Sequence, residues 1–155
     1  MNTIDPPPTP GTPEHTRISA LIVARLRQGP ELVPVRVELS WHPGDPHAIH
    51  ATFQTARTAA KDVRWVLGRE LLAQGLHIPT GIGDVHLCPR DPRGTDPAVT
   101  VLELCTPTGH AVFELDTDEL AELLADTYAH LPFGHEALFL DLDTEITQLL
   151  EEDIR

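Results

Sequence analysis

Apolar and polar positions alternate along much of the first two thirds of the chain. The clearest alternation covers residues 33–41, where the apolar positions are Val33, Val35, Val37, Leu39 and Trp41. A period of two is typical of a β-strand with one buried face. Shorter alternations and β-branched runs predict further strands at 18–26, 49–53, 63–67, 84–88, 98–105 and 110–115. Because turn-rich segments separate several of these strands, we expect an antiparallel meander.

Helical spacing replaces this alternation towards the C-terminus. A helix is predicted between an N-cap at Asp116 and a stop at Pro132, with apolar residues at Leu120, Leu123, Leu124, Tyr128 and Leu131. A last helix is predicted at 142–153, and a short helix at 69–74 is expected to end at Gly75 as its left-handed cap. Strands first and helices last predict an α+β fold, in which the β-meander is followed by two C-terminal helices.

The chain of 155 residues has the length of a single domain. Five of its 15 prolines lie within residues 1–13, so we expect residues 1–15 to form a disordered proline-rich tail and residues 16–155 to form one domain. No stretch approaches 18 consecutive apolar residues, and the first residues lack the basic and apolar regions of a secretory signal. We therefore expect a soluble, cytoplasmic protein without direct membrane insertion.

The net charge of −13 arises entirely in the last third of the chain. Residues 1–102 hold ten acidic and ten basic side chains, whereas residues 103–155 hold 14 acidic side chains and only Arg155. Such a surface repels phosphate backbones, so nucleic acid is not an expected partner. The acidic third is either a solvated face or a docking face for a basic partner. The candidate partner-binding residues lie in the two C-terminal helices and are Glu119, Glu122, Asp126, Glu151, Glu152 and Asp153.

Two groups of residues suggest metal or phosphatase chemistry, but neither pattern is complete. His42, His47 and His50 flank a Pro-Gly-Asp-Pro turn without a cysteine or paired carboxylate, and His50 is expected to point away from His47. Asp141 and Asp143 follow an apolar run, but no lysine or later acidic motif of a phosphatase follows them, so one of them is expected to cap the last helix. We expect surface histidines, no metal site and no cofactor.

The serines and cysteines give no nucleophilic site either. Ser19 and Ser40, the only serines, lie within predicted strands and outside a Gly-x-Ser-x-Gly elbow. Cys88 and Cys105 have apolar neighbours, which disfavour a thiolate. In the expected hairpin Cys88 lies opposite Val99, about 20 Å from Cys105 and too far for a disulfide. We therefore expect reduced thiols and no enzyme.

Several collinear motifs resemble a known family. The longest is Asp62 to Leu76 (DVRWVLGRELLAQGL); the others are 33–39 (VPVRVEL), 45–49 (DPHAI), 51–53 (ATF), 78–85 (IPTGIGDV) and 139–145 (FLDLDTE). Over residues 16–150 the chain resembles the SsgA-like proteins, actinomycete regulators of sporulation-specific cell division. Three features depart from that family and indicate a divergent paralogue. They are the proline-rich tail, Leu67-Gly68 in place of an aromatic residue and alanine, and Cys88 in a position often held by tryptophan.

The resemblance implies a non-enzymatic adaptor acting through protein–protein contacts. It would help to place or recruit the tubulin-like division protein FtsZ at sporulation septa, or act in later wall remodelling. The resemblance also implies a fold similar to the Whirly proteins and a homotrimer, with a dimer as the alternative. The expected partners are further copies of the chain and a division protein such as FtsZ or another SsgA-like protein, met at the septum.

Two other functions stay open from the residues themselves. A single-stranded nucleic-acid-binding module on the Whirly-like scaffold would bind with strong salt dependence through Arg57, Lys61, Arg64, Arg69 or the loop that carries Arg90 and Arg93. A cryptic hydrolase would use Asp141 and Asp143.

Overall fold

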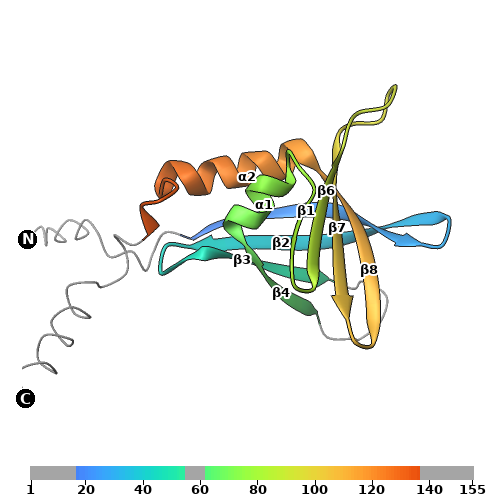
Figure 1. Cartoon of the computed structure of the whole chain (residues 1–155), viewed down its shortest axis with the longest axis horizontal. Helices are drawn as coiled ribbons and strands as arrows, with labels where there is room; N and C mark the ends of the chain where they lie inside the picture. The colour runs from blue at the N-terminus through green and yellow to red at the C-terminus, as the bar shows by residue number, and fades with distance from the viewer. Residues whose placement is uncertain (1–16, 55–61, 137–155) are drawn as a thin grey trace, which may run out of the picture.

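The computed structural model describes residues 17–54 and 62–136, where eight strands form one antiparallel sheet that packs against two helices (Figure 1). The strands are β1 (Ile18–Gln28), β2 (Glu31–His42), β3 (Asp45–Gln54), β4 (Val63–Gly68), β5 (Thr80–Ile82), β6 (Val85–Arg90), β7 (Val99–Thr106) and β8 (Gly109–Asp116). Helix α1 (Arg69–Gly75) follows β4, and helix α2 (Thr117–His130) follows β8. The α+β class and the antiparallel meander are confirmed. The predicted helix at 142–153 and the proline-rich tail lie outside the described residues.

The sheet consists of two four-stranded meanders joined at one edge. Its strand order is β4-β3-β2-β1-β8-β7-β6-β5, so β1 and β8 form the join. At the join only two residue pairs are in register, Arg25 with Glu114 and Leu26 with Phe113. In Figure 1 β1, β2 and β3 run along the molecule, while β6, β7 and β8 run steeply across them. The change of direction at the join bends the sheet around its core.

The inward face of the bent sheet forms one core with both helices. Phe53 of β3 and Phe113 of β8 are separated by two strands in the sheet, yet their ring centroids lie 4.6 Å apart. Trp41 is fully buried, and its indole N–H donates a hydrogen bond to the carbonyl oxygen of Pro46 at 2.9 Å. The helices contribute buried leucines, namely Leu71, Leu72, Leu120, Leu123 and Leu124. The alternation read from the sequence therefore identifies the buried face of the sheet.

The start of α2 follows the predicted capping, whereas the end of α1 does not. The carboxylate of Asp116 accepts a hydrogen bond from the backbone N–H of Glu119 at 3.0 Å. Gly75, however, lies within α1 and is not among the glycines with positive φ, so the prediction of a left-handed cap is wrong. A Cβ at Gly75 would lie 2.6 Å from the Cβ of Leu87 in β6. Glycine is needed there because the helix packs closely on the sheet.

The β6–β7 hairpin differs in register from the prediction. Arg90 pairs with Val99, so the loop covers residues 91–98 and turns at Gly94, which has a φ of +58°. The turn therefore lies slightly later than expected, and Cys88 lies opposite Val101 rather than Val99. Both cysteine thiols are free. No helix among the described residues is long and apolar enough to cross a membrane.

Candidate partner-binding site

Three of the six predicted partner-binding residues form an acidic row on α2. Glu119, Glu122 and Asp126 are spaced by three and four residues, so their side chains project from one side of the helix. All three are exposed, and none of them forms an ion pair with an arginine, lysine or histidine of residues 17–54 and 62–136. Their negative charges are therefore not compensated within this part of the chain. Residues 151–153 lie outside the described residues.

The acidic row lines a groove of about 320 Å³ between α2 and β1. On the strand side the groove is lined by residues 19–22, and Leu123 lies among the acids on the helix side. The groove exists because β8 pairs with β1 only at Arg25 and Leu26 before the chain turns into α2. Helix α2 then packs near the first half of β1, and the groove lies between the helix and the strand.

The first half of β1 therefore carries a free strand edge within the described part of the chain. Residues 18–24 pair with β2 on one side, and no described strand pairs with them on the other. Leu21 and Val23 of this segment are 60% and 54% exposed. An unpaired edge can accept an added strand from another chain. The groove thus combines backbone donors and acceptors, apolar side chains and negative charge.

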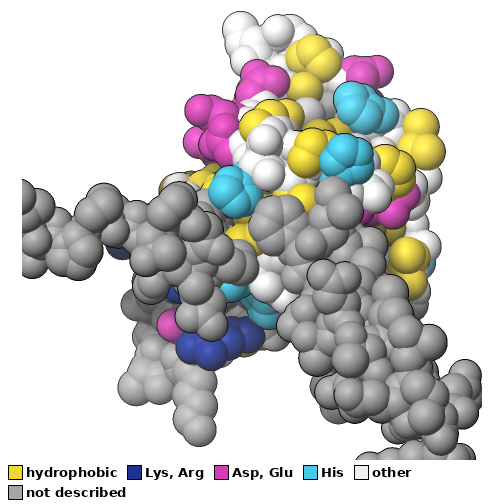
Figure 2. All heavy atoms as spheres, turned by 90° about the vertical axis from the view of Figure 1, so that its left-hand side faces the viewer, with side chains coloured by type: hydrophobic (Ala, Val, Ile, Leu, Met, Phe, Trp, Pro, Cys, Tyr) yellow, Lys and Arg dark blue, Asp and Glu magenta, His cyan; other side chains and the backbone are white. Residues whose placement is uncertain are grey.

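Two of the three histidines considered as metal ligands lie on the surface, and His42 is half-buried. His47 and His50 are exposed, and the Nε2 atom of His50 lies 3.5 Å from the Oδ2 atom of Asp45. Figure 2 looks onto the left-hand side of Figure 1, where histidine side chains are scattered over the face and the largest group of acidic side chains lies at the upper-left margin. His42, His47 and His50 do not converge as metal ligands in the described structure.

Two of the basic residues suggested for nucleic-acid binding, Arg69 and Arg90, form ion pairs within the described structure. Arg69 is 1% exposed, so its assignment as a nucleic-acid contact is wrong. Its guanidinium instead donates hydrogen bonds to the carbonyl oxygens of Thr127 and Leu131 and to the carboxylate of Glu136, at 3.2, 2.9 and 2.8 Å. Arg90 forms an ion pair with Glu114. Arg57, Lys61, Asp141 and Asp143 lie outside the described residues.

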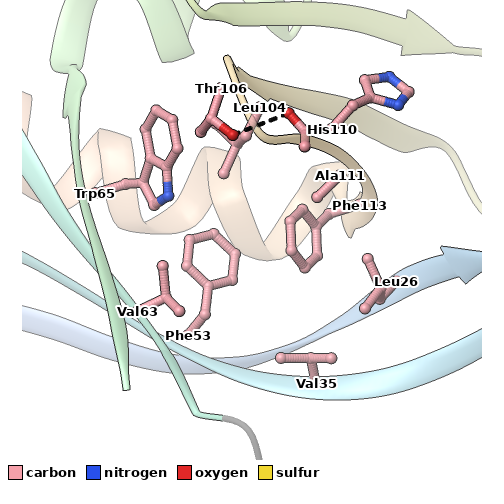
Figure 3. A pocket seen from close by; sticks show the side chains of 11 residues that line it. Leu26, Val35, Phe53, Val63, Trp65, Leu104, Thr106, His110, Ala111 and Phe113 are labelled. Atoms are coloured by element: carbon pink, nitrogen blue, oxygen red, sulfur yellow. Dashed lines mark hydrogen bonds between the residues drawn. The ribbon is translucent and has the colours of Figure 1, made fainter. Parts of the chain in front are cut away.

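An apolar cavity of about 270 Å³ opens where the two meanders face each other (Figure 3). The rings of Phe53 and Phe113 face each other at its centre, and Trp65 closes one side. The imidazole of His110 points away from the cavity. The lining is mostly apolar and suits an apolar side chain or ligand, and the hydroxyl of Thr106 in this lining donates to the carbonyl oxygen of Gly109.

The structure also brings together Glu103, Cys105 and His110, which the sequence analysis did not connect. The Oε1 atom of Glu103 lies 2.7 Å from the Nε2 atom of His110 and 3.7 Å from the Sγ atom of Cys105. Burial raises the pKa of the Cys105 thiol above its ordinary value, and the charge of Glu103 adds to this effect. The short connection between the predicted strands at 98–105 and 110–115 is the signal that could have placed Cys105 opposite His110.

The sequence is similar to that of sporulation and cell division proteins. The family model described as Streptomyces sporulation and cell division protein, SsgA, matches residues 35–136. The sporulation-specific cell division protein SsgB of Saccharopolyspora erythraea is 45% identical over 122 residues, which cover 79% of this chain and 83% of the relative. SsgB of Streptomyces coelicolor is 39% identical over 139 residues, which cover 89% of this chain and 98% of the relative.

Solved structures of similar proteins have the same fold. One, from a study of SsgB mutations that correlate with longitudinal cell division during sporulation of Streptomyces coelicolor, superposes with a TM-score of 0.71 at 37% identity and covers 79% of this chain and 92% of that chain. The SsgA-like sporulation-specific cell division protein of Thermobifida fusca superposes with a TM-score of 0.75 at 31% identity and covers 87% of this chain and 96% of that chain.

Proposed function

Because the chain belongs to the SsgA family of sporulation and cell division proteins, we propose that it is a non-enzymatic adaptor in sporulation-specific cell division. It acts through protein–protein contacts that place the division septum or recruit the division machinery. The observation that carries this proposal is the similarity to sporulation-specific cell division proteins over most of the chain.

The groove between β1 and α2 is the surface that we assign to the partner. The row of Glu119, Glu122 and Asp126 attracts basic side chains and speeds the encounter with a basic partner. The free edge of β1 lies in the same groove, and backbone hydrogen bonds to an added strand do not depend on the side chains of that strand. Affinity thus comes from the strand edge, and selectivity for a basic segment comes from the acidic row.

The proposed partners are division proteins, with FtsZ or another SsgA-like protein as the candidates. We place the chain in the cytoplasm, from where it is recruited to the septum, and we propose that it assembles with copies of itself. A trimer has a mass of about 51 kDa, three times the 17.0 kDa of one chain. Light scattering during size-exclusion chromatography distinguishes this trimer from a dimer of about 34 kDa.

A gene replacement in Streptomyces coelicolor tests the proposed function. A strain without its own SsgB receives the gene of this chain or an empty vector, and sporulation septa are counted in stained aerial hyphae. We expect more septa, at regular spacing, in the strain that carries this chain. Equal septum counts in both strains, with the protein present in full amount on an immunoblot, would contradict the proposed role.

A further inference from the structure

Glu103, Cys105 and His110 form a compact cluster of possible metal ligands on the outer face of the β7–β8 hairpin. One ligand atom from each, a carboxylate oxygen, a thiol sulfur and an imidazole nitrogen, all lie within 4.8 Å of one another. Cys105 and His110 are paired across the two strands, and Glu103 precedes Cys105 by two residues, so all three share one face of the sheet. The backbone pairing therefore fixes the positions from which the three side chains converge.

The spacing of the three atoms is close to that of a tetrahedral zinc site. With zinc–ligand bonds of about 2.0 Å to nitrogen and oxygen and about 2.3 Å to sulfur, neighbouring ligand atoms lie about 3.3–3.6 Å apart. The observed separation of 3.7 Å between Glu103 and Cys105 matches this value. The 2.7 Å between Glu103 and His110 must widen by about half an ångström. Both of these side chains are free to make this movement, since they are 42% and 57% exposed.

The surroundings of the cluster also favour a cation. The backbone carbonyl oxygen of Asp84, the residue before β6, accepts a hydrogen bond from the backbone N–H of Cys105 at 2.8 Å, and the carboxylate of Asp84 adds negative charge near the thiol. Among residues 17–54 and 62–136, no arginine or lysine forms an ion pair with Glu103. A bound cation would therefore meet negative charge that no arginine or lysine of residues 17–54 and 62–136 neutralises.

We propose that Glu103, Cys105 and His110 bind one Zn²⁺ ion. A mixed set of sulfur, nitrogen and oxygen ligands suits zinc better than calcium or magnesium, which require oxygen ligands. Binding replaces the thiol proton of Cys105, which is released to the solvent, by a sulfur–zinc bond. The fourth position of the tetrahedron is open and holds water in the isolated protein. The site is separate from the groove that we assign to the division partner.

Calorimetric titration of the full-length, chelator-treated protein with zinc chloride tests the site. We expect one zinc ion per chain. Each of the variants Cys105→Ser, His110→Ala and Glu103→Gln should weaken zinc binding by more than roughly tenfold, which is the loss expected when only a hydrogen-bond partner of a metal ligand is removed. Cys88→Ser and His47→Ala are the matched controls, because each removes an exposed thiol or imidazole outside the cluster. Both controls should bind zinc as the unmodified chain does.

Cobalt spectroscopy gives a second readout that does not depend on affinity. The unmodified protein and Cys88→Ser should show a thiolate-to-cobalt charge-transfer band, and Cys105→Ser should not. Circular dichroism establishes that each variant is folded. If Cys105→Ser proves unstable, the zinc affinity of His110→Ala decides, because His110 is exposed and its replacement leaves the core intact. Absence of stoichiometric zinc binding, or equal affinity in His110→Ala and the unmodified chain, would overturn the proposal.

Discussion

At the scale of single residues, Arg69 is the most connected buried group of the described structure. Its guanidinium donates to two carbonyl oxygens at the end of α2 and to the carboxylate of Glu136, and its Cζ atom lies 4.1 Å from the ring centroid of Tyr128. Glu136 itself is buried, and its pKa is lowered by a hydrogen bond from its own backbone N–H and by the hydrogen bond and charge of Arg69. One side chain therefore ties the start of α1 to the segment after α2.

Replacement of Arg69 by alanine is expected to lower the free energy of unfolding by about 3–5 kcal/mol, because it leaves the buried carboxylate of Glu136 without its counter-charge. The loss is measured by denaturant unfolding, followed by tryptophan fluorescence. Arg64→Ala, at an exposed position on β4, is the control and should change stability by less than about 0.5 kcal/mol. A stability of Arg69→Ala equal to that of the control would contradict the assigned role.

At the scale of elements, the packing of α1 on β6 depends on the absence of a side chain at Gly75. A left-handed cap would tolerate asparagine, because asparagine adopts positive φ more readily than most residues. A close approach tolerates neither asparagine nor alanine, because the new Cβ would meet the Cβ of Leu87. The two explanations for the same glycine therefore predict different results for one substitution.

We expect Gly75→Ala and Gly75→Asn both to destabilise the protein, by about 1–3 kcal/mol for alanine and by at least as much for asparagine. Thermal unfolding of the two variants measures this loss. Gly94→Asn is the matched control, since Gly94 has a φ of +58° and open space around its Cβ position. If Gly75→Asn were as stable as Gly94→Asn, steric contact with β6 would not be the reason for this glycine.

The sequence predicts those elements that depend on neighbouring residues, and it does not predict those that depend on residues far apart in the chain. Seven of the eight described strands follow from alternation and β-branched runs along the chain, and the start of α2 follows from Asp116, whereas the three-residue strand β5 was not predicted. The register of Cys88 was displaced by two residues because a long loop does not fix the centre of its turn. The pairing of β1 with β8 joins residues about 90 positions apart and leaves no local pattern, so the sequence did not predict it.

The candidate site was only partly predictable from the sequence, because part of it depends on pairing between distant strands. The acidic row on α2 follows from the charge distribution and the helical spacing. The groove beside the row and the free edge of β1 exist only because β8 leaves β1 after two residue pairs. The cluster of Glu103, Cys105 and His110 depends on the register of the β7–β8 hairpin, and its three residues form no known metal-binding motif along the sequence.

At the scale of the whole molecule, Glu114 links the two meanders where the sheet bends. Its side chain is buried on β8 and forms ion pairs with Arg27 of β1 and Arg90 of β6. Burial alone would raise the pKa of Glu114, but the hydrogen bonds and charges of Arg90 and Arg27 outweigh burial and lower the pKa below its ordinary value of 4.5. The carboxylate is therefore more acidic in the folded protein than in the unfolded chain.

This shift predicts a loss of stability in acid. A lowered folded-state pKa contributes stability above about pH 4.5, and this contribution disappears as the pH falls through the folded-state value. Because both arginines are partly exposed, we expect Glu114→Gln to lower the free energy of unfolding at neutral pH by only about 1–2 kcal/mol. Denaturant unfolding at neutral pH and near pH 3 should show a smaller difference between the variant and the unmodified protein in acid. An unchanged difference at both pH values would contradict this account.

The most direct test of the proposed adaptor function is the binding of a division protein at the acidic row of α2. The fluorescently labelled chain is titrated with purified FtsZ, and in parallel with an SsgA-like protein, and binding is followed by anisotropy. The triple variant Glu119→Lys, Glu122→Lys and Asp126→Lys is compared with a control of equal net charge, Glu31→Lys, Asp62→Lys and Asp91→Lys, which lies outside the groove.

The account predicts saturable binding by the unmodified chain and the control, and binding weakened at least about tenfold in the groove variant, which corresponds to about 1.4 kcal/mol. Equal affinity of the groove variant and the control would show that the partner does not bind at α2. Absence of binding to both division proteins would contradict the adaptor function itself.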